Sequence, residues 1–162
     1  MNRHTIDVQI EEPYRSGADT EALRKAAGET LAHEQVDDPA ELVVVVTGDE
    51  TLHDLNLRHR GVDAATDVLA FPHQTKSPPP FVFVNGPGLP RYLGDVVISL
   101  PRARAQAEKA ENTLEAELQL LVVHGVLHLL GYDDQAGDER ARMWRAQKAI
   151  LDTMGVDVNL PD

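Results

Sequence analysis

Five consecutive apolar residues in the first third of the chain most restrict the fold that this sequence can adopt. The run is Leu42-Val43-Val44-Val45-Val46, and four of its residues are β-branched. Branched side chains of this kind favour strands, and an uninterrupted apolar run needs cover on both of its faces. We therefore expect a central strand of a sheet, with other elements packed on each side.

Periodic segments around this run predict further elements. Alternating polar and apolar residues predict a strand with one buried face over residues 5–10. Apolar residues spaced three and four apart predict helices over residues 19–34 and 138–154. Short apolar runs predict additional strands at residues 68–71, 81–84 and 96–98.

Capping residues indicate where three more helices begin. Thr47 with Glu50, and Asn112 with Glu115, have the spacing of a capping box, in which the first residue caps the helix. Ser99 is followed two residues later by a proline, which is also typical of a helix start. Together these elements predict an α+β fold, a mixed sheet of about four strands packed with about five helices.

Length and composition limit the class of protein. The 162 residues are enough for a single domain, residues 1–162, with a buried core. The absence of cysteine excludes disulfides and thiolate ligands, so a metal would need His, Asp or Glu. The N-terminus lacks a signal peptide's apolar segment, and the longest apolar stretch, Leu118 to Leu130, is interrupted by polar residues. We expect a cytoplasmic protein with no membrane partner.

The charge of the chain is strongly acidic but unevenly distributed. Fifteen basic and 27 acidic side chains give a formal net charge of −12, which repels phosphate at long range and argues against a protein that coats nucleic acid. Residues 58–109, in contrast, carry seven basic and four acidic side chains. The middle third of the chain therefore has a local excess of positive charge.

The segment from His124 to Asp134 holds the residues best suited to chemistry. His124 and His128 are four residues apart, so both side chains leave one face of a helix and can reach a single ion. Gly131 can end that helix in a left-handed conformation and turn the chain back, which brings Asp133 or Asp134 towards the histidines. Two histidines and one carboxylate leave a coordination position open, as in a catalytic zinc site.

Two other interpretations of this segment explain it less well than a metal site does. Buried histidines bonded to the backbone explain a histidine pair alone, but they leave the glycine and the carboxylate at these offsets without a reason. A zinc peptidase of the H-E-x-x-H type is disfavoured, because Gly125 stands where that motif has its general base. Glu117, seven residues before His124, is either a partner of a ligand or, more simply, a glutamate that is solvated or lies in the capping region of the helix.

Three separated motifs resemble those of the YbeY endoribonucleases. Residues 124–134 resemble the family's H-G-x-L-H-L-x-G-Y-D-H signature. Residues 55–60 and 66–72 resemble its L-N-x-x-[Y/H]-R and T-D-V-L-[SA]-F-P block, and residues 93–99 resemble its L-G-D-[IV]-x-I-S block. The motifs occur in the family's order, and the similarity extends over residues 42–150.

The resemblance implies a zincin-like α+β fold, one bound zinc ion and single-strand-specific endoribonuclease activity. Its implied partners are a single-stranded ribosomal RNA precursor and the ribosome or small subunit, with roles in 16S rRNA 3′ end maturation and ribosome quality control. His124 and His128 match catalytic zinc ligands, and Arg60 matches a catalytic arginine whose guanidinium suits the charge that develops on a phosphate. Asp134 replaces the final histidine of the signature, and a carboxylate is also a good zinc ligand.

The basic middle third supplies the candidate RNA-binding residues. We expect them to form a basic groove beside the metal, with the acidic excess on the other faces. They are Arg58, Arg60, Arg91, Arg102 and Arg104.

Two other functions stay open at this point. The first is a metal-dependent hydrolase that acts on a substrate other than RNA, because zincin-like sites host several chemistries. The second is a non-enzymatic, ribosome-associated factor in which a structural metal fixes the end of the helix. The sequence also leaves open whether water or the 2′-hydroxyl of RNA is the nucleophile. It does not separate zinc from iron(II), which the same ligands suit.

Overall fold

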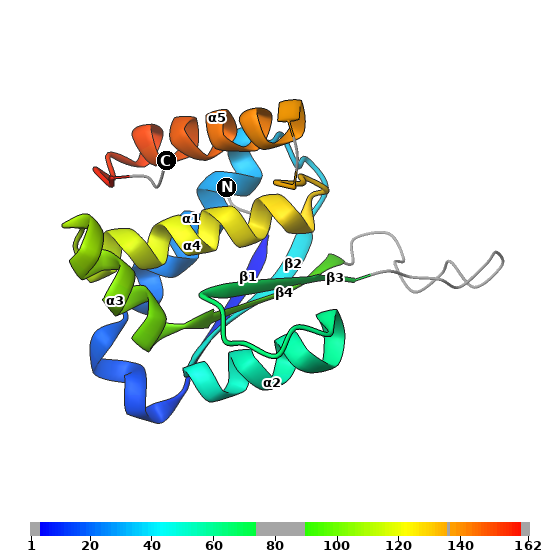
Figure 1. The fold of residues 1–162 in the computed structure, drawn as a ribbon. Coiled ribbons are helices and arrows are strands. Elements are labelled where there is room, and N and C mark those ends of the chain that lie inside the picture. The colour runs from blue at the N-terminus through cyan, green and yellow to red at the C-terminus, as the bar shows by residue number, and fades with distance from the viewer. Residues whose placement is uncertain (1–3, 74–89, 136, 160–162) are drawn as a thin grey trace, which may run out of the picture.

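The computed structural model describes residues 4–73, 90–135 and 137–159 and contains the predicted α+β architecture, with one mixed sheet and helices on both of its faces (Figure 1). Five α-helices are present in the described residues, together with a short 3-10 helix, η1, that the sequence did not indicate. In chain order the elements are β1 (Thr5–Ile10), η1 (Glu12–Gly17), α1 (Thr20–His33), β2 (Ala40–Thr47), α2 (Asp49–Arg60), β3 (Val68–Pro72), β4 (Arg91–Ser99), α3 (Leu100–Ala110), α4 (Leu114–Leu129) and α5 (Gly137–Met154).

The sheet has the strand order β1-β2-β4-β3, which confirms the apolar run of β2 as a central strand. β1, β2 and β4 are parallel, and β3 pairs with β4 in the antiparallel direction. β2 and β4 are in register from Leu42 with Gly94 to Thr47 with Ser99. The two strands therefore end together, at the edge where α2 and α3 begin.

The two faces of the sheet are covered to different extents. Leu42, Val44 and Val46 are fully buried in the main core, where α1 and α4 pack on the sheet (Figure 1). On the other face, half-buried Val45 packs in a smaller cluster that includes Leu52 of α2. Both faces of β2 are covered as predicted, and among the described residues α2 packs on the second one.

α4 is the central helix of the larger layer and is buried along most of its length, because the sheet and helices α1, α3 and α5 all pack against it (Figure 1). At Gly125 the helix approaches β4 so closely that a Cβ atom there would lie 2.5 Å from Cγ1 of Val96. A side chain at position 125 would overlap β4. The absence of a side chain here brings the histidine-bearing end of α4 against the sheet.

The N-caps of two helices differ from the predicted ones by one residue. α2 is capped by Gly48 without a side-chain hydrogen bond, because the hydroxyl of Thr47 instead hydrogen-bonds with Glu11 and Thr51. α4 is capped by Thr113, whose Oγ1 accepts a hydrogen bond from the Ala116 amide at 3.1 Å. Both predicted capping boxes, at Thr47 and Asn112, were therefore one residue too early.

The predicted cap of α3 is confirmed, and β4 is longer than predicted. Ser99 Oγ accepts a hydrogen bond from the Arg102 amide at 3.2 Å. β4 begins at Arg91, before the apolar run, and continues through a register shift at Gly94, which has a φ of 138° and whose backbone lies close to the Phe71 carbonyl of β3. The strand predicted at residues 81–84 lies outside the described residues. Among the helices of the described residues, none is long and apolar enough to cross a membrane.

Candidate metal centre

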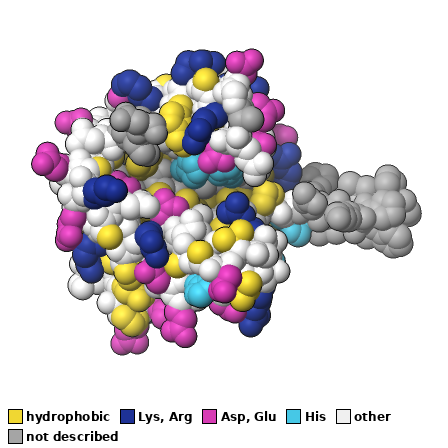
Figure 2. All heavy atoms as spheres, viewed as in Figure 1, with side chains coloured by type: hydrophobic (Ala, Val, Ile, Leu, Met, Phe, Trp, Pro, Cys, Tyr) yellow, Lys and Arg dark blue, Asp and Glu magenta, His cyan; other side chains and the backbone are white. Residues whose placement is uncertain are grey.

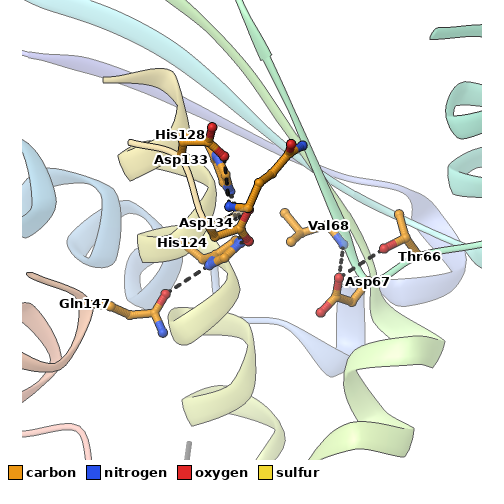
Figure 3. Close-up of polar contacts among 9 residues, drawn as sticks. Thr66, Asp67, Val68, His124, His128, Asp133, Asp134 and Gln147 are labelled. Atoms are coloured by element: carbon orange, nitrogen blue, oxygen red, sulfur yellow. Dashed lines mark hydrogen bonds and ion pairs between the residues drawn. The ribbon is translucent and has the colours of Figure 1, made fainter. Parts of the chain in front are cut away.

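Three side chains that the sequence singled out point at one another at the C-terminal end of α4 (Figure 3). The Nε2 atoms of His124 and His128 are 3.2 Å apart. Oδ2 of Asp134 lies 3.6 Å from Nε2 of His124 and 3.7 Å from Nε2 of His128. Ligands at tetrahedral zinc, with bonds of about 2.0–2.1 Å, are roughly 3.3 Å apart. The three donor atoms therefore fit a single ion.

The turn after α4 brings the chain back towards the histidines, as the sequence predicted. Gly131 has a φ of 102°, and its amide donates to the His128 carbonyl at 3.0 Å, which closes the helix. Tyr132 then anchors the turn, because its hydroxyl donates to Oε1 of Glu34, the C-cap residue of α1, at 2.7 Å. This anchor holds the returning chain against the rest of the molecule, so that Asp134 faces the histidines.

The structure distinguishes between the two aspartates that the sequence left open. Asp133 is exposed, and its Oδ1 accepts a hydrogen bond from the Gln135 amide at 3.0 Å, which caps the local turn. Asp134 is half-buried and joins the two histidines. Asp134 is therefore the candidate third ligand.

A residue that sequence reasoning missed orients one of the histidines. Oε1 of Gln147, on α5, lies 3.0 Å from Nδ1 of His124, and Gln147 is only 2% exposed (Figure 3). The amide oxygen accepts the Nδ1 proton, so the Nε2 lone pair is free to face Asp134. The available signal was a polar residue on the apolar face of α5, between Met143 and Ile150.

Electrostatics at His124 also suits ligation. Burial in the core, with a further contribution from neighbouring His128, lowers the pKa of His124 below its ordinary value of 6.5. A neutral imidazole is the form that binds a metal. His124 is therefore available as a ligand at neutral pH.

The three side chains lie in a cavity of about 540 Å³, which we call the metal cavity. Residues of β3 and of the turn after α4 form its walls, and Arg60, the last residue of α2, also lines it. In the space-filling view the surface is hollowed on this side, with histidine at the centre (Figure 2). The structure thus brings the candidate catalytic arginine and the candidate ligands into one cavity.

Comparison with known proteins now assigns the family. A sequence model described as Endoribonuclease YbeY matches residues 6–155. This chain belongs to the YbeY endoribonuclease family. It is similar to Endoribonuclease YbeY of Roseiflexus castenholzii, with 42% identity over 152 residues that cover 93% of each chain. The Chloroflexus aurantiacus protein of the same description is 43% identical over 157 residues, which cover 94% of this chain and 97% of the relative.

A solved structure supports the fold. The solution structure of a Thermotoga maritima protein has a TM-score of 0.58, and the similarity covers 93% of this chain and 90% of that protein, at 24% sequence identity.

Membership of the YbeY family makes the chain an endoribonuclease of a metal-dependent class that acts on RNA. His124, His128 and Asp134 are its candidate metal site.

The other arginines predicted to bind RNA lie away from the metal cavity. Arg58 pairs with Asp54 on the outer surface of α2 at 3.1 Å, and Nε of Arg102 lies 3.5 Å from Asp49. The guanidinium of Arg104 lies beside η1. Of the five predicted arginines, Arg60 lines the metal cavity. Its lining does not include the other four, among them Arg91 at the start of β4. Their role in RNA binding stays a prediction.

Two acidic residues near the site have roles that differ from simple ligation. Asp67 braces the start of β3, because its Oδ1 accepts from the Val68 amide at 2.8 Å and from the Thr66 hydroxyl at 3.3 Å (Figure 3). Glu117 lies in the first turn of α4, in the capping region that the simpler interpretation allowed, but it is not solvated. The side chain is buried, with 5% of its surface exposed, because α3 and α5 enclose this part of α4.

Proposed function

We propose that this chain is a single-strand-specific endoribonuclease that processes precursor ribosomal RNA in the cytoplasm. Its proposed tasks are maturation of the 16S rRNA 3′ end and ribosome quality control, with the ribosome or small subunit as partner. The observation that carries the proposal is the metal cavity, in which three ligand atoms within 4.8 Å of one another share a wall with Arg60.

The proposed cofactor is one zinc ion held by His124, His128 and Asp134. When bound, zinc polarises a phosphate oxygen or lowers the pKa of a water molecule. Gln147 keeps the Nδ1 proton of His124 in place, so that the opposite nitrogen stays directed at the ion's position. The chain thus supplies both the ligands and the group that fixes the orientation of one of them.

Arg60 is the proposed partner of the scissile phosphate. Negative charge increases on the phosphate oxygens as the phosphodiester bond breaks, and a guanidinium can pair with two of those oxygens at once. Arg60 is exposed at the end of α2 and lines the metal cavity, so a phosphate in the cavity can reach it. The role proposed for Arg60 is electrostatic stabilisation of the transition state.

Packing at position 125 argues against the chemistry of zinc peptidases. The general base of those enzymes is a glutamate that directly follows the first histidine of the motif. A Cβ atom at this position would overlap Val96, so the backbone of α4 lies too near β4 for any such side chain. This observation favours a phosphodiester substrate, which needs the arginine, over a peptide.

The proposal is tested by cleavage of a labelled single-stranded RNA with purified protein of measured metal content. Wild-type protein should cleave it and should leave a duplex of the same sequence intact. Arg60→Glu and His124→Ala should reduce the rate by about 10²-fold or more. Arg145→Glu is the charge-matched control, because it makes the same change on an exposed residue of α5 that does not line the metal cavity.

The control should retain the wild-type rate. Cleavage that persists in both Arg60→Glu and His124→Ala would come from a contaminating nuclease and would contradict the proposal. Precursor 16S rRNA within small subunits, compared with the same RNA stripped of protein, tests the ribosomal substrate. Faster cleavage at the 3′ end within the subunit is the expected result. Metal analysis of protein purified without chelator distinguishes zinc from iron(II).

A further inference from the structure

A second cavity lies on the other side of His124 from the metal cavity. We call it the side cavity; its volume is about 590 Å³, within the range of about 300–1,000 Å³ for small-molecule sites. His124 and Asp67 line both cavities and so form the wall between them. A group bound in the side cavity would therefore be adjacent to the phosphate bound in the metal cavity.

The charged groups of the side cavity differ from those of the metal cavity. Its charged lining consists of Asp67, Glu117 and Lys109, besides the histidine of the shared wall. Two carboxylates and one ammonium group repel a second phosphate, whereas carboxylates accept hydrogen bonds from N–H donors. The charges thus favour a neutral ligand with N–H groups.

Glu117 is the polar group that most needs a partner of this kind. It is 5% exposed and lines the cavity. Its Oε2 accepts one hydrogen bond from the side-chain Nδ2 of Asn112 at 3.1 Å. Burial, and to a smaller extent nearby Asp67, raises the pKa of Glu117 above 4.5. A buried carboxylate is stabilised by additional hydrogen-bond donors, and a ligand with paired N–H groups would supply them.

An aromatic wall and an apolar floor complete the side cavity. Trp144 of α5 is half-buried, and its ring centroid lies 5.8 Å from that of His124. Leu120 and Leu121 of α4 also line the cavity. Unpaired RNA bases are bound by stacking on aromatic side chains together with hydrogen bonds to their edges. Indole, leucine and carboxylate are the components of such a site.

We propose that the side cavity binds a guanine base of the RNA strand, next to the phosphate in the metal cavity. The Watson–Crick edge of guanine carries N1–H and N2–H donors side by side, which one carboxylate accepts together, and O6, which accepts from an ammonium group. Glu117 and Lys109 supply these two partners, and Trp144 supplies the stacking surface. This inference rests on the proposed function, because it names the base that the endoribonuclease selects.

The test uses the fluorescence of Trp144, the only tryptophan of the chain. Metal-loaded protein is titrated with four single-stranded pentanucleotides, UUGUU, UUAUU, UUCUU and UUUUU, with 2′-O-methyl riboses that lack a free 2′-hydroxyl. Guanine stacked on the indole quenches its emission. The guanine pentanucleotide should quench with a dissociation constant at least about tenfold lower than the other three, since a matched pair of hydrogen bonds discriminates bases by that amount or more.

Two variants connect the preference to the cavity. Glu117→Gln replaces one acceptor by a donor, which suits adenine better than guanine, and should abolish the tenfold preference or reverse it. Glu115→Gln is the matched control, because the same change on an exposed residue of α4 should leave the preference intact. Ala110→Phe places a larger side chain in the cavity from α3 and leaves Glu117 itself unchanged. It should abolish quenching by every pentanucleotide.

The outcomes separate this inference from the proposed function. Equal dissociation constants for the four pentanucleotides, absence of quenching, or an unchanged guanine preference in Glu117→Gln would each overturn the inference. Cleavage of single-stranded RNA is measured in parallel on the same protein samples. A protein that cleaves RNA without base preference retains the proposed function and loses the side-cavity site, whereas one that binds guanine without cleaving loses the function alone.

Discussion

The metal cavity and the side cavity share a wall but differ in charge. The metal cavity combines an arginine with the three candidate ligands, so it suits the phosphate of a nucleotide. The side cavity combines two carboxylates with tryptophan and leucines, so it suits a base. The difference explains how a chain with a net charge of −12 can act on RNA, because attraction to phosphate is local. Binding should accordingly be weak and salt-sensitive, and a presented substrate or a partner should strengthen it.

The largest expected effect separates the two cavities by removing a ligand from one of them. Asp134→Ala should lose bound metal and lower RNA cleavage by about 10²-fold or more, while the guanine preference of the side cavity persists. Metal analysis, cleavage and Trp144 quenching measure the three quantities. Asp133→Ala should retain the metal, because Asp133 caps its own turn. Equal losses in both variants would contradict the assignment of Asp134.

Gln147 tests the wall between the cavities, since it hydrogen-bonds to His124 and lines the side cavity. Gln147→Leu preserves the volume approximately and removes the acceptor for the Nδ1 proton. Metal affinity should fall by about 10–100-fold, the usual consequence of losing such a partner. A competition titration against a chelator measures it. Unchanged affinity, with an unchanged melting temperature, would show that the hydrogen bond does not orient His124.

A smaller effect concerns the identity of the third ligand in the metal cavity. Asp134→His replaces an anionic ligand by a neutral one and increases the net positive charge of the site. A water molecule bound to zinc at this site would then ionise at lower pH. The acidic midpoint of the pH–rate profile should therefore move to lower pH. Measurement of RNA cleavage over a pH series, with metal content confirmed at each pH, tests this expectation. A midpoint that stays or rises would contradict it.

The smallest expected effect belongs to the side cavity and concerns stability. The pKa of Glu117 is raised in the folded state, mainly by burial, so the folded protein holds this proton more tightly than the unfolded chain does. The associated stabilisation is present at low pH and is lost as pH rises from 4.5 through the folded-state pKa. Glutamine does not titrate.

Urea unfolding of wild type and Glu117→Gln from about pH 5 to about pH 8 measures this effect. The wild type should lose free energy of unfolding relative to the variant as pH rises. Titration of all other groups is common to both proteins and cancels in the difference. A difference that is constant with pH, or that grows in favour of the wild type, would contradict the burial of this carboxyl group.

The metal cavity was largely predictable from the sequence, whereas the side cavity was not. Helical periodicity places His124 and His128 on one face, and Gly131 turns the chain locally, so short-range rules suffice. Glu117 and Trp144 become neighbours only because α5 packs across α4. Sequence periodicity identifies an apolar face of a helix but not the element that packs on it, which is why the burial of Glu117 could not be predicted.

Local rules also explain the smaller errors in the fold. The capping boxes at Thr47 and Asn112 had valid spacing, but tertiary contacts decided which residue became the cap. Thr47 ends a buried strand, where its hydroxyl hydrogen-bonds with Glu11 and Thr51. The side-chain Nδ2 of Asn112 donates to the carbonyl of Asn159 at 3.0 Å. Glu11 and Asn159 are distant in sequence from the residues that they bond, so spacing alone could not reveal the competition.

RNA cleavage by this chain should depend on a single ion held by His124, His128 and Asp134. The most direct test measures the initial rate of single-stranded RNA cleavage by metal-free protein as zinc is added in known amounts. The rate should rise in proportion to bound zinc and level off at one equivalent per chain. Cleavage at the full rate without metal, or a rate that does not follow occupancy of that single site, would contradict the account.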